Sequence, residues 1–447
     1  MTATLETTTS PQVAALAEMA RASITAGPSF FRNQREAALA RFLSLGIPTT
    51  KHEDWRYTRL NNLANTTFAL PDGSAKVKAD EAAEFAVPGL TCHTLAFVDG
   101  RYVPQLSEIH KLPEGVRVCT LREACISDLA MVEKHLGKQA NVQSKAFEAL
   151  NTAFLEDGVF VHVPRGKVIE EPIQILSIAT AGDTPIITNP RNLIIVEDSA
   201  QCTVIEHYVA QGEGVYLTNA LTEIVLGDNA FAGHYLIEEE SPKAFQISSL
   251  HARIGRASHL DSHTVLLGGA LVRNEISPTL DGEGGNCVVN GLYVGGQSQH
   301  LDNFMFIKHM KPHCESHQFY NGILNDQSHG VFSGRIFVDQ IAQKTDAKQT
   351  SANLLLSDDA QIDTKPQLEI YADDVKCTHG ATIGQLDEDA MFYLRARGIS
   401  KDAARAMLVF AFAAETFARM KLEPIREMLE RKMLSRLPEG EFLASVL

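Results

Sequence analysis

The sequence predicts a mainly β core built as a solenoid, with a helical region on each side. Three observations carry this prediction. From Gly158 onward the chain consists of short β-branched runs separated by Gly, Asp and Asn. Turn signals recur with a period of roughly 27 to 30 residues, and no helical pattern intervenes. A β-sandwich also has short strands, so it remains the alternative, but regular recurrence favours stacked coils.

The N-terminal region, residues 1–157, combines helical patterns with short strand-like pieces. We expect helices over residues 11–26 and 30–45. Gly46 and Pro48 end the second helix, because glycine accepts a left-handed turn and proline cannot continue a helix. Residues 71–80 are predicted to form a polar connection.

The core region, residues 158–385, contains the recurring strands. Residues 159–163, 193–196 and 222–226 are apolar and β-branched, as expected of buried strands. The turn signals that follow such runs end at Ala200, Ala230 and Ala257. The acidic run Glu238–Glu240 is interpreted as solvated charge.

The C-terminal region, residues 386–447, returns to a helical pattern. A helix is predicted over residues 387–396, where Gly398 stops it, and a longer one from the N-cap Ser400 to about Leu422. Pro424 opens a last helix, whose apolar residues lie at helical spacing. We expect these last two helices to pack together and project from the end of the solenoid, where they would either cap the core or dock a partner.

Composition limits the function. The 447 residues carry a net charge of −15 and no basic block, which argues against nucleic-acid binding. Seven scattered cysteines without CxxC spacing argue against a disulfide framework and suggest a reducing, cytoplasmic environment. Residues 1–10 do not resemble a secretory signal. The longest apolar run, residues 406–414, is about half the length of a membrane span.

Cys377 and His379 form the most specific chemical pattern, in a run of small and apolar residues. Side chains two residues apart in a strand point to the same face, so we expect the thiol and the imidazole to lie side by side. Such a pair offers two metal ligands, or a thiol beside a base. A buried, inert Cys377 is the structural alternative.

A second group of potential metal ligands lies between residues 300 and 317. Its members are His300, Asp302, His309, His313, Cys314 and His317. Their spacing matches no HExxH motif, and polar residues on strands and turns would give the same pattern. The chain also has no phosphate-binding loop, no nucleophile elbow and no dinucleotide fingerprint, so we expect no ATP hydrolysis by this chain. The lone Trp55 is interpreted as a packing anchor.

Three segments resemble the SufB/SufD family of the SUF iron–sulfur cluster assembly system, and within it the SufD branch. They are residues 53–58, residues 354–370 and residues 374–399, the last being the most specific. SufB typically carries a glutamate where this chain has Gly380. The resemblance covers nearly the whole chain and implies a right-handed parallel β-helix flanked by helical domains.

The resemblance also implies partners and a site. The chain would pair with SufB through the β-helix, forming a heterodimer, and bind the ATPase SufC through C-terminal helices at about 400–440. His379 matches the interface histidine of the family, and Cys377 stands at the position of an important cysteine of SufB. No cofactor would be bound stably by this chain alone, because an iron–sulfur cluster would form transiently at the interface.

Two other functions remain open from the sequence. One is a metal-dependent enzyme that uses the cluster at 300–317. The other is a structural homodimer that stores or occludes SufC.

Overall fold

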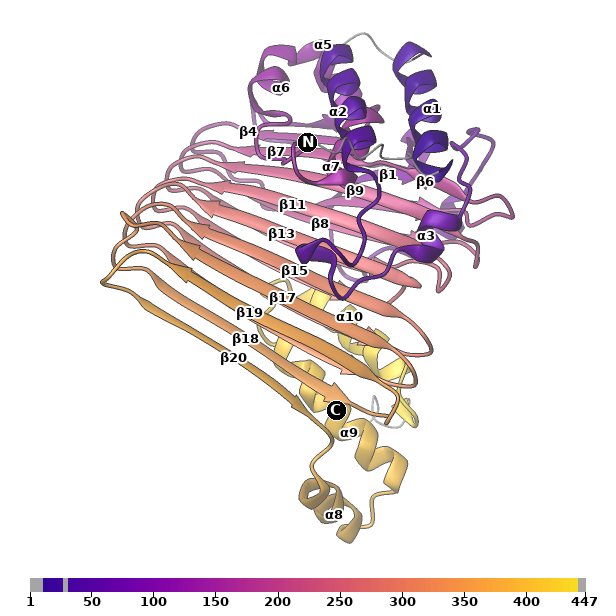
Figure 1. Cartoon of the computed structure of the whole chain (residues 1–447), viewed down its shortest axis with the longest axis vertical. Coiled ribbons are helices and arrows are strands. Elements are labelled where there is room, and N and C mark those ends of the chain that lie inside the picture. Colours follow the sequence, from indigo (N-terminus) through magenta and orange to yellow (C-terminus); the bar gives the residue numbers. More distant parts are fainter. Residues whose placement is uncertain (1–10, 27–30, 441–447) are drawn as a thin grey trace, which may run out of the picture.

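The strands of this protein stack into a two-sheet β-solenoid, flanked by helices on both outer faces (Figure 1). The structure is a computed structural model that describes residues 11–26 and 31–440. Three parts of the predictions lie outside these ranges. They are the interpretation of residues 1–10, the predicted helix start at Phe30, and the last seven residues of the C-terminal region.

The strands are bounded as follows: β1 His93–Val98, β2 Arg101–Tyr102, β3 Arg117–Thr120, β4 Val159–Val163, β5 Ile173–Ala179, β6 Ile186–Thr188, β7 Arg191–Val196, β8 Gln201–Ala210, β9 Tyr216–Leu226, β10 Phe231–Glu239, β11 Phe245–Ile254, β12 His259–Leu266, β13 Leu271–Leu280, β14 Asn286–Gly295, β15 His300–His309, β16 Glu315–Leu324, β17 His329–Val338, β18 Asp346–Leu355, β19 Gln361–Ile370 and β20 Lys376–Gly384. The α-helices are α1 Pro11–Ala26, α2 Arg32–Leu45, α3 Asn61–Asn65, α4 Ala79–Ala83, α5 Leu121–Ser127, α6 Leu129–His135, α7 Ala146–Ala153, α8 Glu388–Ala396, α9 Lys401–Phe417 and α10 Glu423–Ser435. Two 3₁₀ turns are η1 Glu53–Trp55 and η2 Pro104–Leu106.

From β7 onward successive strands alternate between two sheets, which we call the β20 sheet and the β19 sheet after their last strands. The β20 sheet runs β2-β1-β5-β8-β10-β12-β14-β16-β18-β20, and the β19 sheet runs from β19 through the odd-numbered strands to β7, β4 and β3. From β8 and β7 onward each strand pairs in parallel with the strand two positions later, and partners from β8 to β20 are 27 to 31 residues apart. The predicted period and the solenoid are therefore confirmed, and the sandwich alternative is excluded.

Left-handed residues turn the chain at the corners of the coils. Ser199, Asn229 and Ala257 have φ angles of 57°, 54° and 52°. All three lie in the turn signals that the sequence analysis singled out. A non-glycine residue in this conformation is costly, and the hydrogen bonds of the stacked coils offset the cost. For example, the Ser199 N–H donates to the Asp228 carbonyl of the next coil at 2.8 Å.

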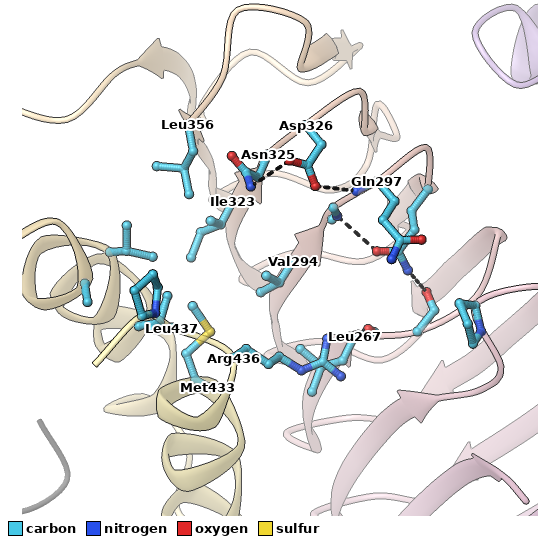
Figure 2. A pocket seen from close by; sticks show the side chains of 18 of the residues that line it. Leu267, Val294, Gln297, Ile323, Asn325, Asp326, Leu356, Met433, Arg436 and Leu437 are labelled. Carbon is cyan, nitrogen blue, oxygen red and sulfur yellow. Dashed lines mark hydrogen bonds between the residues drawn. The ribbon is translucent and has the colours of Figure 1, made fainter. Parts of the chain in front are cut away.

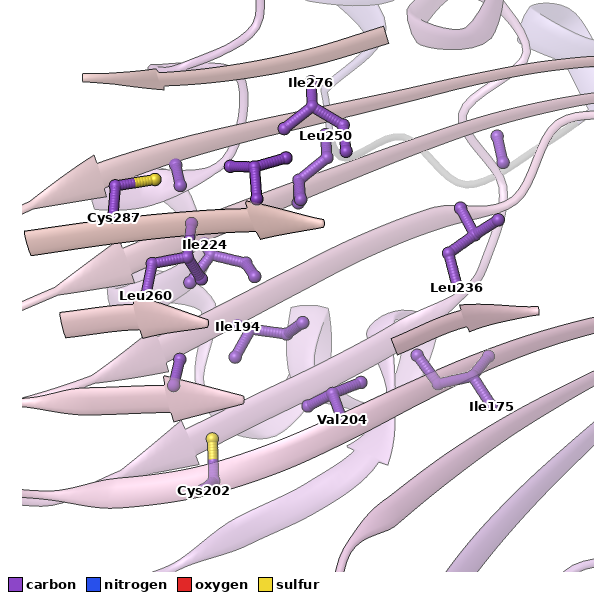
Figure 3. Packing of buried hydrophobic residues seen from close by; sticks show 14 of the residues in the cluster. Ile175, Ile194, Cys202, Val204, Ile224, Leu236, Leu250, Leu260, Ile276 and Cys287 are labelled. Carbon is purple, nitrogen blue, oxygen red and sulfur yellow. The ribbon is translucent and has the colours of Figure 1, made fainter. Parts of the chain in front are cut away.

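Apolar side chains fill much of the solenoid interior (Figure 3), together with a buried polar group in which Glu206 accepts hydrogen bonds from Asn192 and Tyr208. Inward-facing side chains such as Ile224, Leu236 and Leu250 are at most 4% exposed. Each coil buries these side chains against its neighbours, which a single coil cannot do. Burial also raises the pKa of the Cys202 thiol in this interior to about 12.

The N-terminal helices cover the outer face of the β19 sheet. Residues of α1, α2 and α7 pack with Phe245, Ile247 and Leu271, which point outward from that sheet. The polar connection predicted over residues 71–80 is present, except that α4 begins at Ala79. Strand β1 of this region also pairs in parallel with β5, so the N-terminal region extends the solenoid.

The C-terminal helices fold back along the outer face of the β20 sheet (Figure 1). Val409 and Phe417 of α9 and Met428 of α10 pack against outward residues such as Ile237 and Val265. The expectation that this pair projects from the end of the solenoid was therefore wrong, and α9 also ends at Phe417 instead of about Leu422. An apolar outer sheet face needs cover, and the helices supply it.

Helix α8 is different, because none of its residues is buried. Its N-cap Asp387 accepts hydrogen bonds from two backbone N–H groups, and Gly398 follows the helix with a φ of 89°, as the sequence predicted. Phe392 and Tyr393 are 74% and 58% exposed. No helix in the described ranges is long and apolar enough to span a membrane.

Truncating the anchor of α9 should loosen the C-terminal cover. Phe417 is 1% exposed, so Phe417→Ala should cost about 3–5 kcal/mol. Hydrogen exchange measured by mass spectrometry should then increase in α9 and α10. Phe392→Ala is the matched control and should leave exchange unchanged, because that ring is already in solvent. Equal protection in Phe417→Ala and the unmodified protein would contradict the assigned packing.

Candidate functional site

The candidate site lies on β20, the last strand of its sheet. Cys377 stands opposite Ala347 of β18, and His379 stands opposite Gln349. Both partners are at most 1% exposed, because they face the solenoid interior. Cys377 and His379 therefore share the inward face, as predicted, but no further coil covers them.

The two side chains differ in exposure. Cys377 is half-buried and packs with Ala347, Leu368 and Val375. Burial, followed by the charge of Asp346, raises the pKa of the Cys377 thiol, so it is protonated at neutral pH. His379 is exposed at the open end of the solenoid.

The chemistry available here is that of two ligands. An imidazole nitrogen and a thiolate both bind iron, and metal binding would release the thiol proton. Four ligands usually complete an iron–sulfur site. Two donors on one edge can therefore form only part of such a site.

The backbone of β20 is also unpaired along its outer edge. The Lys376 N–H donates to the Thr345 carbonyl, so even-numbered residues of β20 pair with β18. Because successive residues of a strand point their N–H and C=O groups to opposite sides, the odd-numbered residues face outward. These residues include Cys377 and His379, so the candidate ligands lie on the free edge.

The outer edge of β19 is less suited to pairing. The Tyr371 N–H donates to the Val338 carbonyl of the previous coil, so odd-numbered residues point their N–H groups toward β17. The backbone N–H groups of the even-numbered residues of β19 therefore point to the free edge. One of them is Pro366, which has no N–H to donate. The β20 edge contains no proline, and its donors run without interruption from Cys377 to Ile383.

Apolar side chains surround the open end. Ile370, Tyr371 and Ile383 are 37%, 61% and 53% exposed. A β-carbon at Gly380 would meet no atom within 4 Å. An exposed strand edge flanked by apolar residues is typical of a protein interface.

The cluster at 300–317 does not assemble into a site. His300 and His309 lie at opposite ends of β15, about 30 Å apart at the rise of an extended strand. His309 is buried and hydrogen-bonds the Ser316 hydroxyl at 2.8 Å, and the Cys314 thiol donates to the Gly282 carbonyl at 3.3 Å. His313 lies in a corner turn and His317 on β16. The site that the metal-dependent enzyme hypothesis requires is therefore not formed by these residues.

Asp302 instead belongs to the attachment of the N-terminal region. It forms a buried ion pair with Arg273 and accepts a hydrogen bond from Thr58 at 2.5 Å. The Arg273 guanidinium lies 4.0 Å from the Trp55 ring centre. The packing interpretation of Trp55 is confirmed, because a cation–π contact and an ion pair fix this segment on the β19 sheet.

The structure brings together a second group that sequence reasoning missed. His110 Nδ1 lies 2.6 Å from Glu171, and His93 Nε2 lies 3.9 Å from the same carboxylate. Among the described residues this is the one trio of side chains placed to hold a metal. However, His93 Nδ1 already accepts the His110 backbone N–H at 3.1 Å. A neutral His93 ring then carries its proton on Nε2, so this trio is an ion-pair network and not a ready ligand set.

No sequence pattern could have found this trio. His93 and His110 are 17 residues apart, and Glu171 follows 61 residues later. The pairing of β1 with β5 brings the segments together. The adjacent carboxylate raises the pKa of His110, whereas burial lowers the pKa of His93.

A pocket of about 490 Å³ lies between the C-terminal helices and the ends of β14 and β16 (Figure 2). Leu267, Val294, Ile323, Met433 and Leu437 give it apolar walls. Among the described residues, its polar lining includes the carboxylates of Glu239, Glu240 and Asp326 and the guanidinium groups of Arg405 and Arg436, and no histidine, cysteine, serine or lysine.

The acidic run beside this pocket is buried, so its interpretation as solvated charge was wrong. Glu238 is 0% exposed and accepts the backbone N–H groups of Glu240 and Gly268 at 2.9 Å. Burial raises the pKa of Glu238 to about 7 and raises the pKa of Glu240 as well. Glu239 instead faces outward and pairs with His207 and Lys432. Burial raises its pKa, but the hydrogen bonds and charges of His207 and Lys432 outweigh burial and lower the pKa to about 2.

Comparison with known proteins places these features in a family context. Residues 178–412 match the family model described as "SUF system FeS cluster assembly, SufBD core domain". Residues 8–175 match the "SufBD protein N-terminal region". The chain is 33% identical to the iron–sulfur cluster assembly protein SufD of Escherichia coli over 91% of its own length and 93% of the relative. It is also 33% identical to a SufBD family protein of Synechocystis, with 94% of each chain covered, and 26% identical to SufD of Bacillus subtilis, with 91% and 94% covered.

The buried His309 should make stability depend on pH. Burial lowers its pKa from 6.5 to about 4, so the unfolded chain binds the proton more readily than the folded chain. The stabilisation is complete above pH 6.5 and is lost as the pH falls toward 4. Between pH 7 and pH 5 this histidine should account for a loss of about 2 kcal/mol.

Urea unfolding at the two pH values would measure this effect. His309→Gln should reduce the loss of stability, because glutamine can bond to Ser316 but does not titrate. Ser316→Ala keeps the ring and should retain the pH dependence. The same loss in His309→Gln as in the unmodified chain would contradict the assignment.

Proposed function

Because this chain belongs to the SufBD family of iron–sulfur cluster assembly proteins, we propose that it is a non-catalytic subunit of the SUF scaffold. Its role is to pair with a second solenoid and contribute ligands to a nascent cluster. The single observation that carries the proposal is the free edge of β20, where His379, Cys377 and unpaired backbone groups lie together.

SufB is the proposed partner at this edge. A second solenoid of the same family could extend the sheet beyond β20 by adding a strand to its free edge. Pairing would satisfy the outward donors of Cys377, His379 and Ala381 and cover the apolar side chains nearby. It would also desolvate Cys377 and His379, which are then placed beside the ligands of the other chain.

The cluster is the cargo of this site. His379 is the stronger candidate ligand, because its imidazole is exposed and binds iron in its neutral form. Cys377 has a raised pKa and becomes a ligand once a metal displaces its proton. Two donors on one chain do not hold a cluster stably, so assembly depends on the interface.

SufC is the proposed source of ATP hydrolysis, because this sequence lacks a phosphate-binding loop. We place its docking surface on the C-terminal helices at about 400–440. Helices α9 and α10 use their inner faces against the β20 sheet, so their outer faces remain for a partner. The exposed rings of Phe392 and Tyr393 on α8 extend the same region.

Replacing His379 tests the ligand role. His379→Ala in a complex reconstituted with SufB and SufC should lower the yield of assembled cluster at least tenfold, measured by absorbance and iron content. The complex itself should still form. Cys377→Ser, compared in parallel, separates the contributions of thiol and imidazole. Normal assembly with His379→Ala would remove His379 from the mechanism.

Blocking the edge tests the pairing role. Ala381→Pro removes an outward N–H from β20 without removing a bond to β18, so it should weaken binding to SufB by about tenfold or more. Ala381→Ser keeps the N–H and is the matched control. Light scattering of each variant with and without SufB measures the assembly. Unchanged binding by Ala381→Pro would contradict pairing at β20, and a stable homodimer that excludes SufB would favour the storage function.

A further inference from the structure

A column of polar side chains inside the solenoid ends at His379. Gln318 of β16, Gln349 of β18 and His379 of β20 are direct neighbours in the parallel register. The two glutamines are 2% and 1% exposed, so their amides are enclosed by the coils. Residues in register on one sheet face have β-carbons about 5 Å apart, within reach of a hydrogen bond between long side chains.

The amide of Gln349 is oriented by the coil before it. Its Nε2 donates to Gln318 Oε1 at 2.7 Å. Its Oε1 is buried and has no hydrogen-bond partner among the described residues. The oxygen and nitrogen of an amide point in different directions. Because the Gln349 nitrogen is turned back toward Gln318, the Gln349 oxygen points toward the next coil, which contains β20. His379 is the residue of that coil that faces it.

The opposite sheet leaves room for this amide. Gly334 of β17 lies beside Gln349, and a β-carbon at Gly334 would collide with Gln349 Nε2. An alanine there would displace the amide from its place under His379. The glycine and the hydrogen bond to Gln318 together hold an unsatisfied acceptor in a buried position, which is costly unless a donor completes it.

We propose that Gln349 is a positioning residue for His379. Its Oε1 accepts a hydrogen bond from one ring N–H of His379, which fixes the tautomer and leaves the other nitrogen as a lone pair toward the open edge. Metal-binding histidines are commonly oriented in this way by an acceptor on the second nitrogen. The inference rests on the proposed function, because it assigns His379 the ligand role and adds the residue that aims it.

The tautomer of His379 tests this inference directly. The full chain would be labelled with ¹⁵N-histidine, and His379→Ala would identify the resonances of His379. At a pH where the ring is neutral, the unmodified protein should show one dominant tautomer. Gln349→Met has a similar size but no acceptor, and it should shift the tautomer ratio about fivefold, as expected for an ordinary net hydrogen bond.

Two further variants separate positioning from packing. Ser351→Ala removes another inward polar group of β18, two residues from Gln349, and should leave the ratio unchanged. Gln349→Glu keeps an acceptor and should retain or sharpen the dominant tautomer, so it also serves if Gln349→Met does not fold. An unchanged ratio in Gln349→Met, or a loss of preference in Gln349→Glu, would overturn the inference.

The spectrum also distinguishes this inference from the proposed function. If Gln349→Met shifts the tautomer but His379→Ala assembles clusters normally, Gln349 positions the ring and the ligand role fails. If His379→Ala abolishes assembly while Gln349→Met leaves the tautomer unchanged, the ligand role stands and the positioning inference fails.

Discussion

Parallel pairing of one coil with the next is the interaction on which the rest of this protein depends. Each strand satisfies the backbone of the strand before it and offers its own outer edge to the strand after it. A solenoid cannot close on itself in the way a barrel does, so its last coil always leaves an unpaired edge. The chain places Cys377 and His379 on that edge, where backbone groups remain free to pair.

The helical regions follow from the same constraint. Stacked coils bury their inner side chains but leave two apolar outer faces. The N-terminal helices cover one face, and Arg273, Asp302 and Trp55 attach the segment that crosses it. The C-terminal helices cover the other face. Among the described residues, the open end and α8 expose apolar side chains such as Ile383 and Phe392, where assembly with other chains is proposed.

The solenoid interior carries polar groups among its apolar side chains. In the first coils Glu206 accepts hydrogen bonds from Asn192 and Tyr208, and under His379 the interior carries the amides of Gln318 and Gln349. Buried amides are retained at a cost unless they are fully paired. Their position directly beneath the exposed histidine gives the interior a role beyond packing, because it can set the orientation of a side chain on the surface.

Much of the fold was predictable from the sequence because it repeats. The period of the turn signals fixed the solenoid, and local signals such as Ser400, Gly398 and Pro424 marked the helix ends correctly. The pairing of Cys377 and His379 on one face followed from strand geometry alone. Contacts between distant segments could not be read in this way, and the burial of Glu238 and the direction in which α9 folds were both misjudged.

The sequence by itself therefore determined the coil, its period and the identity of the two candidate ligands. Each of these depends on residues that are neighbours along the chain or that recur at a fixed spacing. Only the tertiary structure decided that the residues at 300–317 stay apart, that His93, His110 and Glu171 meet, and that Gln349 lies under His379. Those relations depend on which strands stack and in which register, and that is set by the packing of the whole solenoid.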